Sequence, residues 1–176
     1  MARNVEIKAR IENVGLIVPK VTPFATSGPI EIAQDDTFFN CVNGRLKLRA
    51  FSNDAGELIF YRRANQAGPK ESFFLRSPTS SPETLRESLS LAYGQVGRIR
   101  KYRTLFLVGR TRVHLDRVED LGHFLELEVM LEDGESPEVG IREASDLMER
   151  LGIQPAQLIE GAYLDLMLEM GSDPIS

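Results

Sequence analysis

Apolar and charged residues alternate with a period of two along most of this 176-residue chain. In residues 4–11, for example, Val5 and Ile7 fall on one side, and Glu6 and Lys8 fall on the other. Because successive side chains of a β-strand point to opposite faces, this alternation predicts strands with one apolar and one charged face. A chain dominated by such strands is expected to form an antiparallel sheet whose apolar face is covered.

The alternation predicts eight strands, and apolar residues at helical spacing predict three helices. Asn43-Gly44 predicts a tight hairpin between the second and third strands. Residues 14–24 stay open between helix and loop, because their apolar content favours a helix that two prolines interrupt. The predicted strands are residues 4–11, 36–42, 45–51, 58–63, 72–76, 103–108, 110–117 and 124–130. The predicted helices begin at Pro82 (and extend to Val96), near Pro137 and near Pro155.

Length and composition indicate one folded domain. Hydrophobic residues make up 42% and charged residues 27% of the chain, which is ordinary for a globular protein. We expect a single domain at residues 1–170, followed by a C-terminal tail at 171–176.

The same composition excludes several classes of protein. No stretch approaches the roughly 18 consecutive apolar residues of a membrane span, and the first residues lack the apolar run of a signal peptide. The single cysteine, Cys41, rules out an internal disulfide and a cysteine metal cage, so a reducing cytoplasm is the expected location. The net charge of −5 argues against a nucleic-acid partner.

One predicted strand carries an unusual row of like charges. Arg45, Lys47 and Arg49 share a face with no acidic residue between them. The ordinary interpretation of such a face is the solvent side of a half-buried sheet. Like charges on one face lower stability, however, and a bound polyanion would offset the repulsion. A triphosphate fits best, because guanidinium and ammonium groups match phosphate oxygens.

An acidic pair lies on a late predicted strand. Glu126 and Glu128 are two residues apart, so both carboxylates point to one side. Two parallel carboxylates repel each other unless a cation lies near them, and Mg²⁺ and Mn²⁺ take such oxygen ligands. A closed antiparallel barrel would place the basic rows and this pair around one polar lumen, with the three helices covering an apolar outer wall.

Other chemistry is only weakly indicated. No Gly-rich phosphate loop of the Walker or Rossmann kind occurs, so phosphate binding has to come from side chains. Cys41 lies in an apolar strand context and is expected to be structural. His114 lies on a charged face with Arg112 and Asp116, where a surface role and a site role are equally open.

Seven short segments, in order along nearly the whole chain, carry a more specific pattern. They are residues 4–8, 34–39, 44–49, 58–63, 110–116, 122–128 and 162–167. Together they resemble the CYTH, or triphosphate tunnel metalloenzyme, superfamily, and most closely its class IV adenylate cyclase (CyaB-like) branch. One departure is Asn4, which stands where the family's N-terminal ExExK signature has its first glutamate.

The resemblance implies an α+β fold built on a closed eight-stranded antiparallel β-barrel with flanking helices. It also implies that the lumen binds a triphosphate and that Mg²⁺ or Mn²⁺ takes part in phosphoryl chemistry. The candidate metal ligands are then Glu6, Glu126 and Glu128. Asn4 offers a carbonyl oxygen but no charge, which affects metal affinity or the number of ions bound.

The candidate site residues follow from the charged rows and the resemblance together. Arg62 and Arg63 cannot both point inward, because neighbouring side chains alternate, and Arg62 is favoured. The candidate catalytic residues are Lys8, Arg112 and Asp116, the last as a base. The candidate substrate-binding residues are Lys8, Arg10, Arg45, Lys47, Arg49, Arg62, Lys101, Arg103, Arg110 and Arg112.

The leading hypothesis is an adenylate cyclase that converts ATP to cyclic AMP and pyrophosphate. The alternatives are an inorganic tripolyphosphatase or thiamine triphosphatase of the same fold, a non-catalytic nucleotide or polyphosphate binder, and a plain interaction domain. The expected partner is a small triphosphate, with no nucleic acid and no membrane, and family members of the cyclase branch suggest a homodimer.

Overall fold

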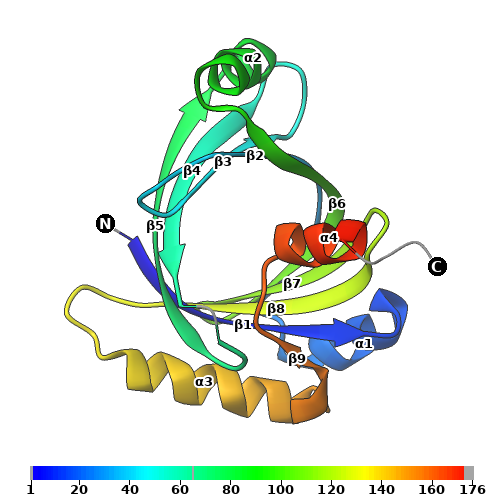
Figure 1. Ribbon diagram of the computed structural model, residues 1–176. Helices are drawn as coiled ribbons and strands as arrows, with labels where there is room; N and C mark the ends of the chain where they lie inside the picture. Colours follow the sequence, from blue (N-terminus) through cyan, green and yellow to red (C-terminus); the bar gives the residue numbers. More distant parts are fainter. Residues whose placement is uncertain (1, 65, 173–176) are drawn as a thin grey trace.

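The computed structural model describes residues 2–64 and 66–172 of the chain (Figure 1). These residues form nine strands and four α-helices, with two short 3₁₀ turns at Thr22–Phe24 and Pro155–Gln157. The strands are β1 (Ala2–Ile11), β2 (Ser27–Phe39), β3 (Arg45–Ala50), β4 (Gly56–Arg63), β5 (Lys70–Thr79), β6 (Gln95–Val108), β7 (Thr111–Val118), β8 (Gly122–Met130) and β9 (Leu158–Ile159). The helices are α1 (Val14–Val21), α2 (Pro82–Tyr93), α3 (Pro137–Arg150) and α4 (Tyr163–Ser172).

Eight of the strands close into a ring. Their order is β5-β4-β3-β2-β6-β7-β8-β1, every pairing is antiparallel, and a further pairing of β1 with β5 closes the circle. The short β9 adds to the other half of β1, where Lys8 pairs with Ile159. The predicted α+β fold with a closed eight-stranded antiparallel ring is therefore confirmed.

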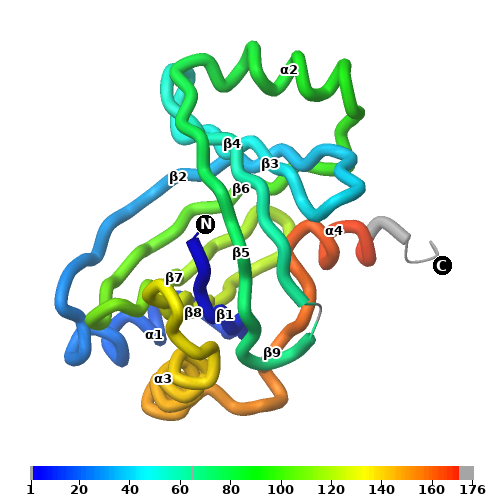
Figure 2. The backbone as a smooth tube through the Cα atoms, turned by 90° about the vertical axis from the view of Figure 1, so that its left-hand side faces the viewer, coloured from blue at the N-terminus to red at the C-terminus, as the bar shows by residue number. Residues whose placement is uncertain are grey.

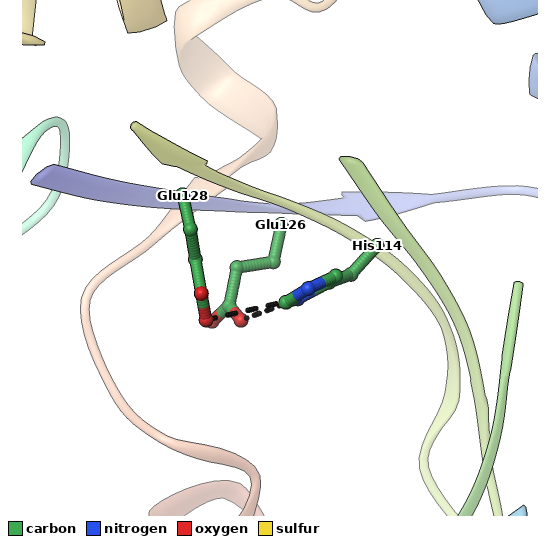
Figure 3. Close-up of side chains that lie close together, drawn as sticks. All are labelled: His114, Glu126 and Glu128. Carbon is green, nitrogen blue, oxygen red and sulfur yellow. Dashed lines mark hydrogen bonds and ion pairs between the residues drawn. The ribbon is translucent and has the colours of Figure 1, made fainter. Parts of the chain in front are cut away.

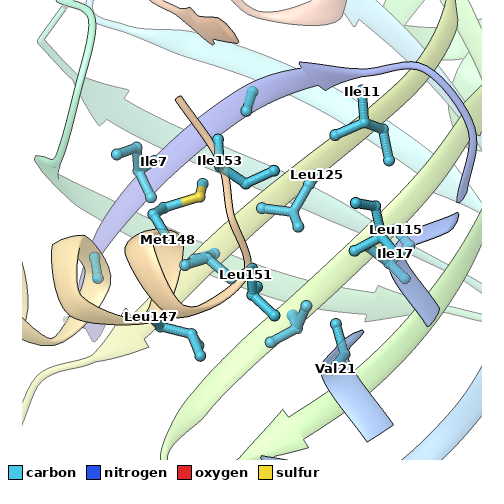
Figure 4. Packing of buried hydrophobic residues seen from close by; sticks show 14 of the residues in the cluster. Ile7, Ile11, Ile17, Val21, Leu115, Leu125, Leu147, Met148, Leu151 and Ile153 are labelled. Atoms are coloured by element: carbon cyan, nitrogen blue, oxygen red, sulfur yellow. The ribbon is translucent and has the colours of Figure 1, made fainter. Parts of the chain in front are cut away.

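The apolar outer wall of the ring packs against two helices. Inward and outward residues alternate along β1, so that Val5 and Ile7 face α3 on the outside. The outward residues of β7 and β8 pack in the same cluster with α1 and α3 (Figure 4). Helix α3 comes so near to β1 that a Cβ atom on Gly140 would lie 2.8 Å from Cγ2 of Val5.

The other two helices lie elsewhere on the ring. Figures 1 and 2 show α2 on the opposite side from α3, packed against β2 and β3. Helix α4 lies against β6 at one end of the ring. Its residues Tyr163 and Leu164 join Phe38, Ile99 and Phe124 in a second apolar cluster, which fills that end.

Several element boundaries differ from prediction. Residues 14–24 form α1 and a 3₁₀ turn, while α2 ends at Tyr93 because Gly94 takes a positive φ of 81°, which leaves Val96 to β6. The third predicted helix is also corrected. It begins at Tyr163 rather than near Pro155, because the intervening Leu158–Ile159 pairs with β1 as a strand.

The end of the chain differs in part from the predicted tail at residues 171–176. Helix α4 runs to Ser172, so the backbone of residues 171–172 belongs to this helix. The rest of the predicted tail, 173–176, lies outside the described residues. Across the described part of the chain, no helix is both long enough and apolar enough to cross a membrane.

The helix-covered wall should carry much of the stability. Leu115 is fully buried in this wall, so Leu115→Ala is expected to lower the free energy of unfolding by about 2–5 kcal/mol. The control is Leu91→Ala on α2, where the side chain is 83% exposed and the change should stay within about 0.5 kcal/mol. Urea denaturation measures both, and equal effects would contradict this account of the core.

Candidate functional site

The ring encloses a cavity of about 200 Å³ that is lined mainly by polar and charged side chains. Eight basic side chains face five acidic ones across it, so the lumen carries an excess of positive charge. The basic residues are Lys8, Lys47, Arg49, Arg63, Arg76, Lys101, Arg103 and Arg112. The acidic residues are Glu6, Asp36, Glu57, Glu126 and Glu128.

Asp36 on β2 forms ion pairs with three of the basic side chains. Its two oxygens accept bonds from Nε and Nη2 of Arg49 at 2.8 Å each, and Nζ of Lys101 and of Lys47 lie at 3.1 and 3.4 Å. Burial and the neighbouring Arg49 lower the pKa of Lys47 to about 8, and burial lowers the pKa of Lys101 well below its usual value. One carboxylate does not neutralise three cations, so this wall can accept further negative charge.

Asp116 on β7 holds Arg103 in place. Both oxygens of the fully buried carboxylate accept bonds from Arg103 at 2.8 Å, and the hydroxyl of Tyr163 donates to Oδ2 at 2.7 Å. Burial alone would raise the pKa of Asp116, but the Arg103 guanidinium brings it below its usual range. The predicted role of Asp116 as a base is therefore corrected, because its oxygens are already engaged; it positions Arg103.

A third group combines two carboxylates with a histidine (Figure 3). Nδ1 of His114 lies 3.1 Å from Oε1 of Glu126 and 3.8 Å from Oε1 of Glu128, and the ligand atoms of all three lie within 4.8 Å of one another. Burial and the charge of Glu126 raise the pKa of Glu128 to about 7, while burial and Arg103 lower the pKa of His114 to about 4. Glu126 stays ionised, because Lys8 and His114 outweigh its burial and hold its pKa well below the usual value.

This donor set fits a divalent cation. Two carboxylates that repel each other are stabilised by a cation between them. The predicted ligands Glu126 and Glu128 come together as expected. Glu6 lies opposite Glu128 in the β1–β8 register, and its Oε1 accepts a bond from Nη1 of Arg63 at 2.7 Å. The group whose ligand atoms converge contains His114 with Glu126 and Glu128.

Two predicted phosphate ligands lie outside the ring. Arg110 lies in the turn before β7, where the strand alternation does not apply, and binds Glu135 and Glu143 outside the ring. Arg62 is exposed and donates to the carbonyl of Asn43. These placements correct the predictions for both residues.

Two further predicted ligands lie at the covered end of the ring. Arg10 is exposed, donates to the carbonyl of Leu121 and stacks over Phe124 with 4.8 Å between guanidinium and ring centre. It lies beyond the lumen because the apolar cluster around Phe124 fills the ring there. Arg45 pairs with Asp165 of α4 at 2.8 Å and is also absent from the lumen lining.

Arg63 is a lumen residue that sequence reasoning missed. It follows Ile59 and Tyr61 on the inward face of β4, and this parity was the available signal. Its Nε and Nη2 atoms are buried without a partner. Asn4 Oδ1, Gln34 Oε1, Arg112 Nε and His114 Nε2 share this property around the same lumen. Buried polar atoms are normally bonded, so these atoms indicate a polar ligand.

The CYTH domain family matches residues 2–163, which is nearly the whole chain. The chain therefore belongs to the CYTH domain family. Two of its relatives in sequence carry adenylate cyclase names, which agrees with the prediction that this chain is an enzyme.

Two relatives align in sequence. The Methanocaldococcus jannaschii protein MJ0240, named as a candidate adenylate cyclase, is 25% identical over 174 residues, which cover 92% of this chain and 97% of that protein. Adenylate cyclase CyaB of Aeromonas hydrophila is 36% identical over 77 residues, which cover 44% of this chain and 40% of that enzyme.

Solved structures show the same fold. The PH1012 protein of Pyrococcus horikoshii has a TM-score of 0.82 at 24% identity and covers 93% of this chain and 98% of that one. HpAC1 of Hippeastrum, described as having a dominant triphosphatase activity, has a TM-score of 0.64 at 14% identity and covers 99% of this chain and 98% of that one.

The neighbours Arg62 and Arg63 offer a matched pair of variants. Arg63→Gln removes a buried cation from the lumen, and we expect it to weaken binding of a non-hydrolysable ATP analogue about ten- to a hundredfold. Arg62→Gln changes a side chain outside the lumen and should leave the affinity unchanged. Isothermal titration calorimetry measures both affinities, and thermal unfolding checks the folds. Equal losses in the two variants would contradict the assigned parity of β4.

The lowered pKa of Lys47 predicts that ligand affinity depends on pH. Because its pKa is about 8, it loses its charge as the pH rises through that value. Affinity for the same analogue, measured in chelator, should therefore fall between pH 7 and pH 9. Lys47→Arg keeps a positive charge over this range, so its profile should fall less steeply. Superimposable profiles would show that Lys47 does not contact the ligand.

Proposed function

We propose that this protein is a metal-dependent enzyme that converts ATP to cyclic AMP and pyrophosphate, with the triphosphate bound in the lumen of the ring. The observation that carries the proposal is the excess of basic side chains around an enclosed cavity, most of them buried or half-buried. Two of them, Arg63 and Arg112, have buried donors without a partner. Triphosphate is a small ligand with enough negative charge to balance such a wall.

The phosphate end of the substrate suits the walls formed by β3 and β6. Lys47 and Arg49 lie on β3, and Lys101 and Arg103 lie on β6. Arg103 is fixed by Asp116 and Tyr163, so its position costs no reorganisation when charge develops. A divalent cation held by Glu126 and Glu128 would neutralise charge on the phosphate oxygens.

The two ends of the lumen differ, and the difference favours an organic triphosphate. The end near α4 is filled by the apolar cluster around Phe124. At the other end three apolar side chains line the cavity, those of Ile32, Phe51 and Met130. Each of them lies two residues along the chain from a polar residue that also lines the lumen. Phe51 is 40% exposed there. An aromatic ring at the cavity mouth is suited to stack on a nucleobase, which inorganic tripolyphosphate lacks.

The reaction itself needs mainly positioning. The ribose 3′-hydroxyl attacks the α-phosphorus, its proton is released, and the bond to the β-phosphate oxygen breaks, so that pyrophosphate leaves with the electron pair. Lysine and arginine side chains along β3 and β6 would stabilise the charge on that leaving group. Both sequence relatives carry adenylate cyclase names, which supports this reaction.

Triphosphate hydrolysis is the second candidate. The same lumen and cation site would also serve attack by water on the terminal phosphate. HpAC1 shares the fold and is described as a triphosphatase. In this reaction, water attacks the terminal phosphorus, the bond to the bridging oxygen breaks, and the diphosphate leaves with the electron pair, so that orthophosphate is formed.

Product analysis separates these reactions. We expect incubation with ATP and Mn²⁺ or Mg²⁺ to yield cyclic AMP and pyrophosphate, and Glu126→Gln to abolish the product. Glu87→Gln, on the exposed face of α2, is the matched control and should be fully active. Orthophosphate from ATP, thiamine triphosphate or tripolyphosphate would favour the second candidate. Triphosphate binding without turnover would indicate a non-catalytic binder, and no binding would contradict the lumen assignment.

A homodimer, a cytoplasmic location and the lack of nucleic-acid and membrane partners stay predictions of the sequence. Sedimentation of the purified protein would test the first of these.

A further inference from the structure

We propose that His114 is a direct metal ligand through Nδ1, and that it forms with Glu126 and Glu128 a mixed nitrogen–oxygen site that prefers Mn²⁺ over Mg²⁺. The inference rests on the proposed function, because it concerns the ion of the same lumen. It adds a nitrogen ligand from β7 to the two carboxylates of β8.

The spacing of Nδ1 of His114 from the two carboxylates suits one ion. Ligands about 2.1 Å from a shared octahedral ion lie about 3.0 Å apart when adjacent and about 4.2 Å apart when opposite. Nδ1 of His114 lies 3.1 Å from Glu126 Oε1 and 3.8 Å from Glu128 Oε1, which falls within that span. The β7–β8 register produces this convergence, because His114 lies directly opposite Glu126 and Glu128 lies two residues further along β8.

The neighbouring cations do not separate Nδ1 of His114 from the two carboxylates. Lys8 approaches Oε2 of Glu126 at 3.4 Å, whereas Oε1 faces Nδ1 of His114 at 3.1 Å, with Nη2 of Arg103 further away at 3.8 Å. Glu6 is engaged by Arg63 at 2.7 Å and does not belong to the converging group. In Figure 3 the imidazole edge and the two carboxylates point toward one common region.

The second nitrogen of His114 is an independent sign of a ligand. The side chain is 1% exposed and Nε2 is buried without a hydrogen-bond partner. When Nδ1 binds an ion, the imidazole proton lies on Nε2. That N–H can then donate to a phosphate oxygen or a water molecule in the lumen.

The donor set predicts the metal preference. Mg²⁺ is bound mainly by oxygen and keeps several of its waters. Mn²⁺ accepts the same carboxylate oxygens as Mg²⁺. As a first-row transition ion it is softer than Mg²⁺, so it loses less affinity when an imidazole nitrogen takes the place of an oxygen ligand. Replacing one oxygen by a histidine nitrogen therefore shifts the preference toward Mn²⁺.

Electron spin echo envelope modulation of the Mn²⁺-loaded protein tests the ligand directly. We expect a ¹⁴N coupling typical of a coordinated imidazole in the wild-type protein. The chain has two histidines, so the source can be assigned. His114→Gln should remove the coupling, and His123→Gln should retain it. Bound Mn²⁺ without ¹⁴N coupling in the wild-type protein would overturn the proposal, and so would a failure to bind Mn²⁺.

Metal affinities provide a second readout. His114→Gln should weaken Mn²⁺ binding about ten- to a hundredfold and Mg²⁺ binding much less. Equal affinities for each ion in variant and wild type would contradict the assignment. Neither measurement depends on turnover, so an inactive protein with a ¹⁴N-coupled Mn²⁺ would refute the proposed function and leave this inference standing.

Discussion

The need to pair charges inside a closed ring shapes the rest of this structure. Each strand alternates apolar and charged residues, and closing the sheet brings the charged rows inward, where water is limited. Buried charges are tolerated only with partners. Asp36 therefore binds three cations, Asp116 binds Arg103, and Glu126 lies between Lys8 and His114. The apolar wall consequently faces outward, and α1 and α3 have to cover it.

The same charge arrangement prepares the lumen for an anion. Basic groups outnumber acidic ones, and unpartnered atoms such as Nε of Arg63 and Nε of Arg112 stay buried in the wall. The ion pairs that stabilise the ligand-free ring also hold Arg103 and Arg49 in fixed positions, so little reorganisation is needed when phosphate enters. The acidic cluster on β7 and β8 adds a cation site beside this positive wall.

Much of this arrangement follows from the sequence, because a period of two assigns each strand residue to one face. The inward rows of Lys47 and Arg49, and of Glu126 and Glu128, were predictable for that reason. The assignment of a side chain to the inward or outward face fails where the strand alternation stops or allows two choices. Arg110 lies in a turn, and Arg62 and Arg63 are both basic, so composition could not choose between them. The role of Leu158–Ile159 as a strand and the convergence of His114 with Glu126 depend on partners distant in sequence.

A crystal structure with Mn²⁺ and a non-hydrolysable ATP analogue tests the central claim most directly. The account predicts the phosphates inside the ring, bonded to lysine and arginine side chains of β3 and β6, with the base toward Phe51. A second, larger cavity of about 760 Å³ shares Gln34, Phe51 and Lys101 with the lumen lining and is otherwise lined by residues that do not line the lumen, including Asp35 and Tyr102. An analogue bound there, with an empty lumen, would contradict the account.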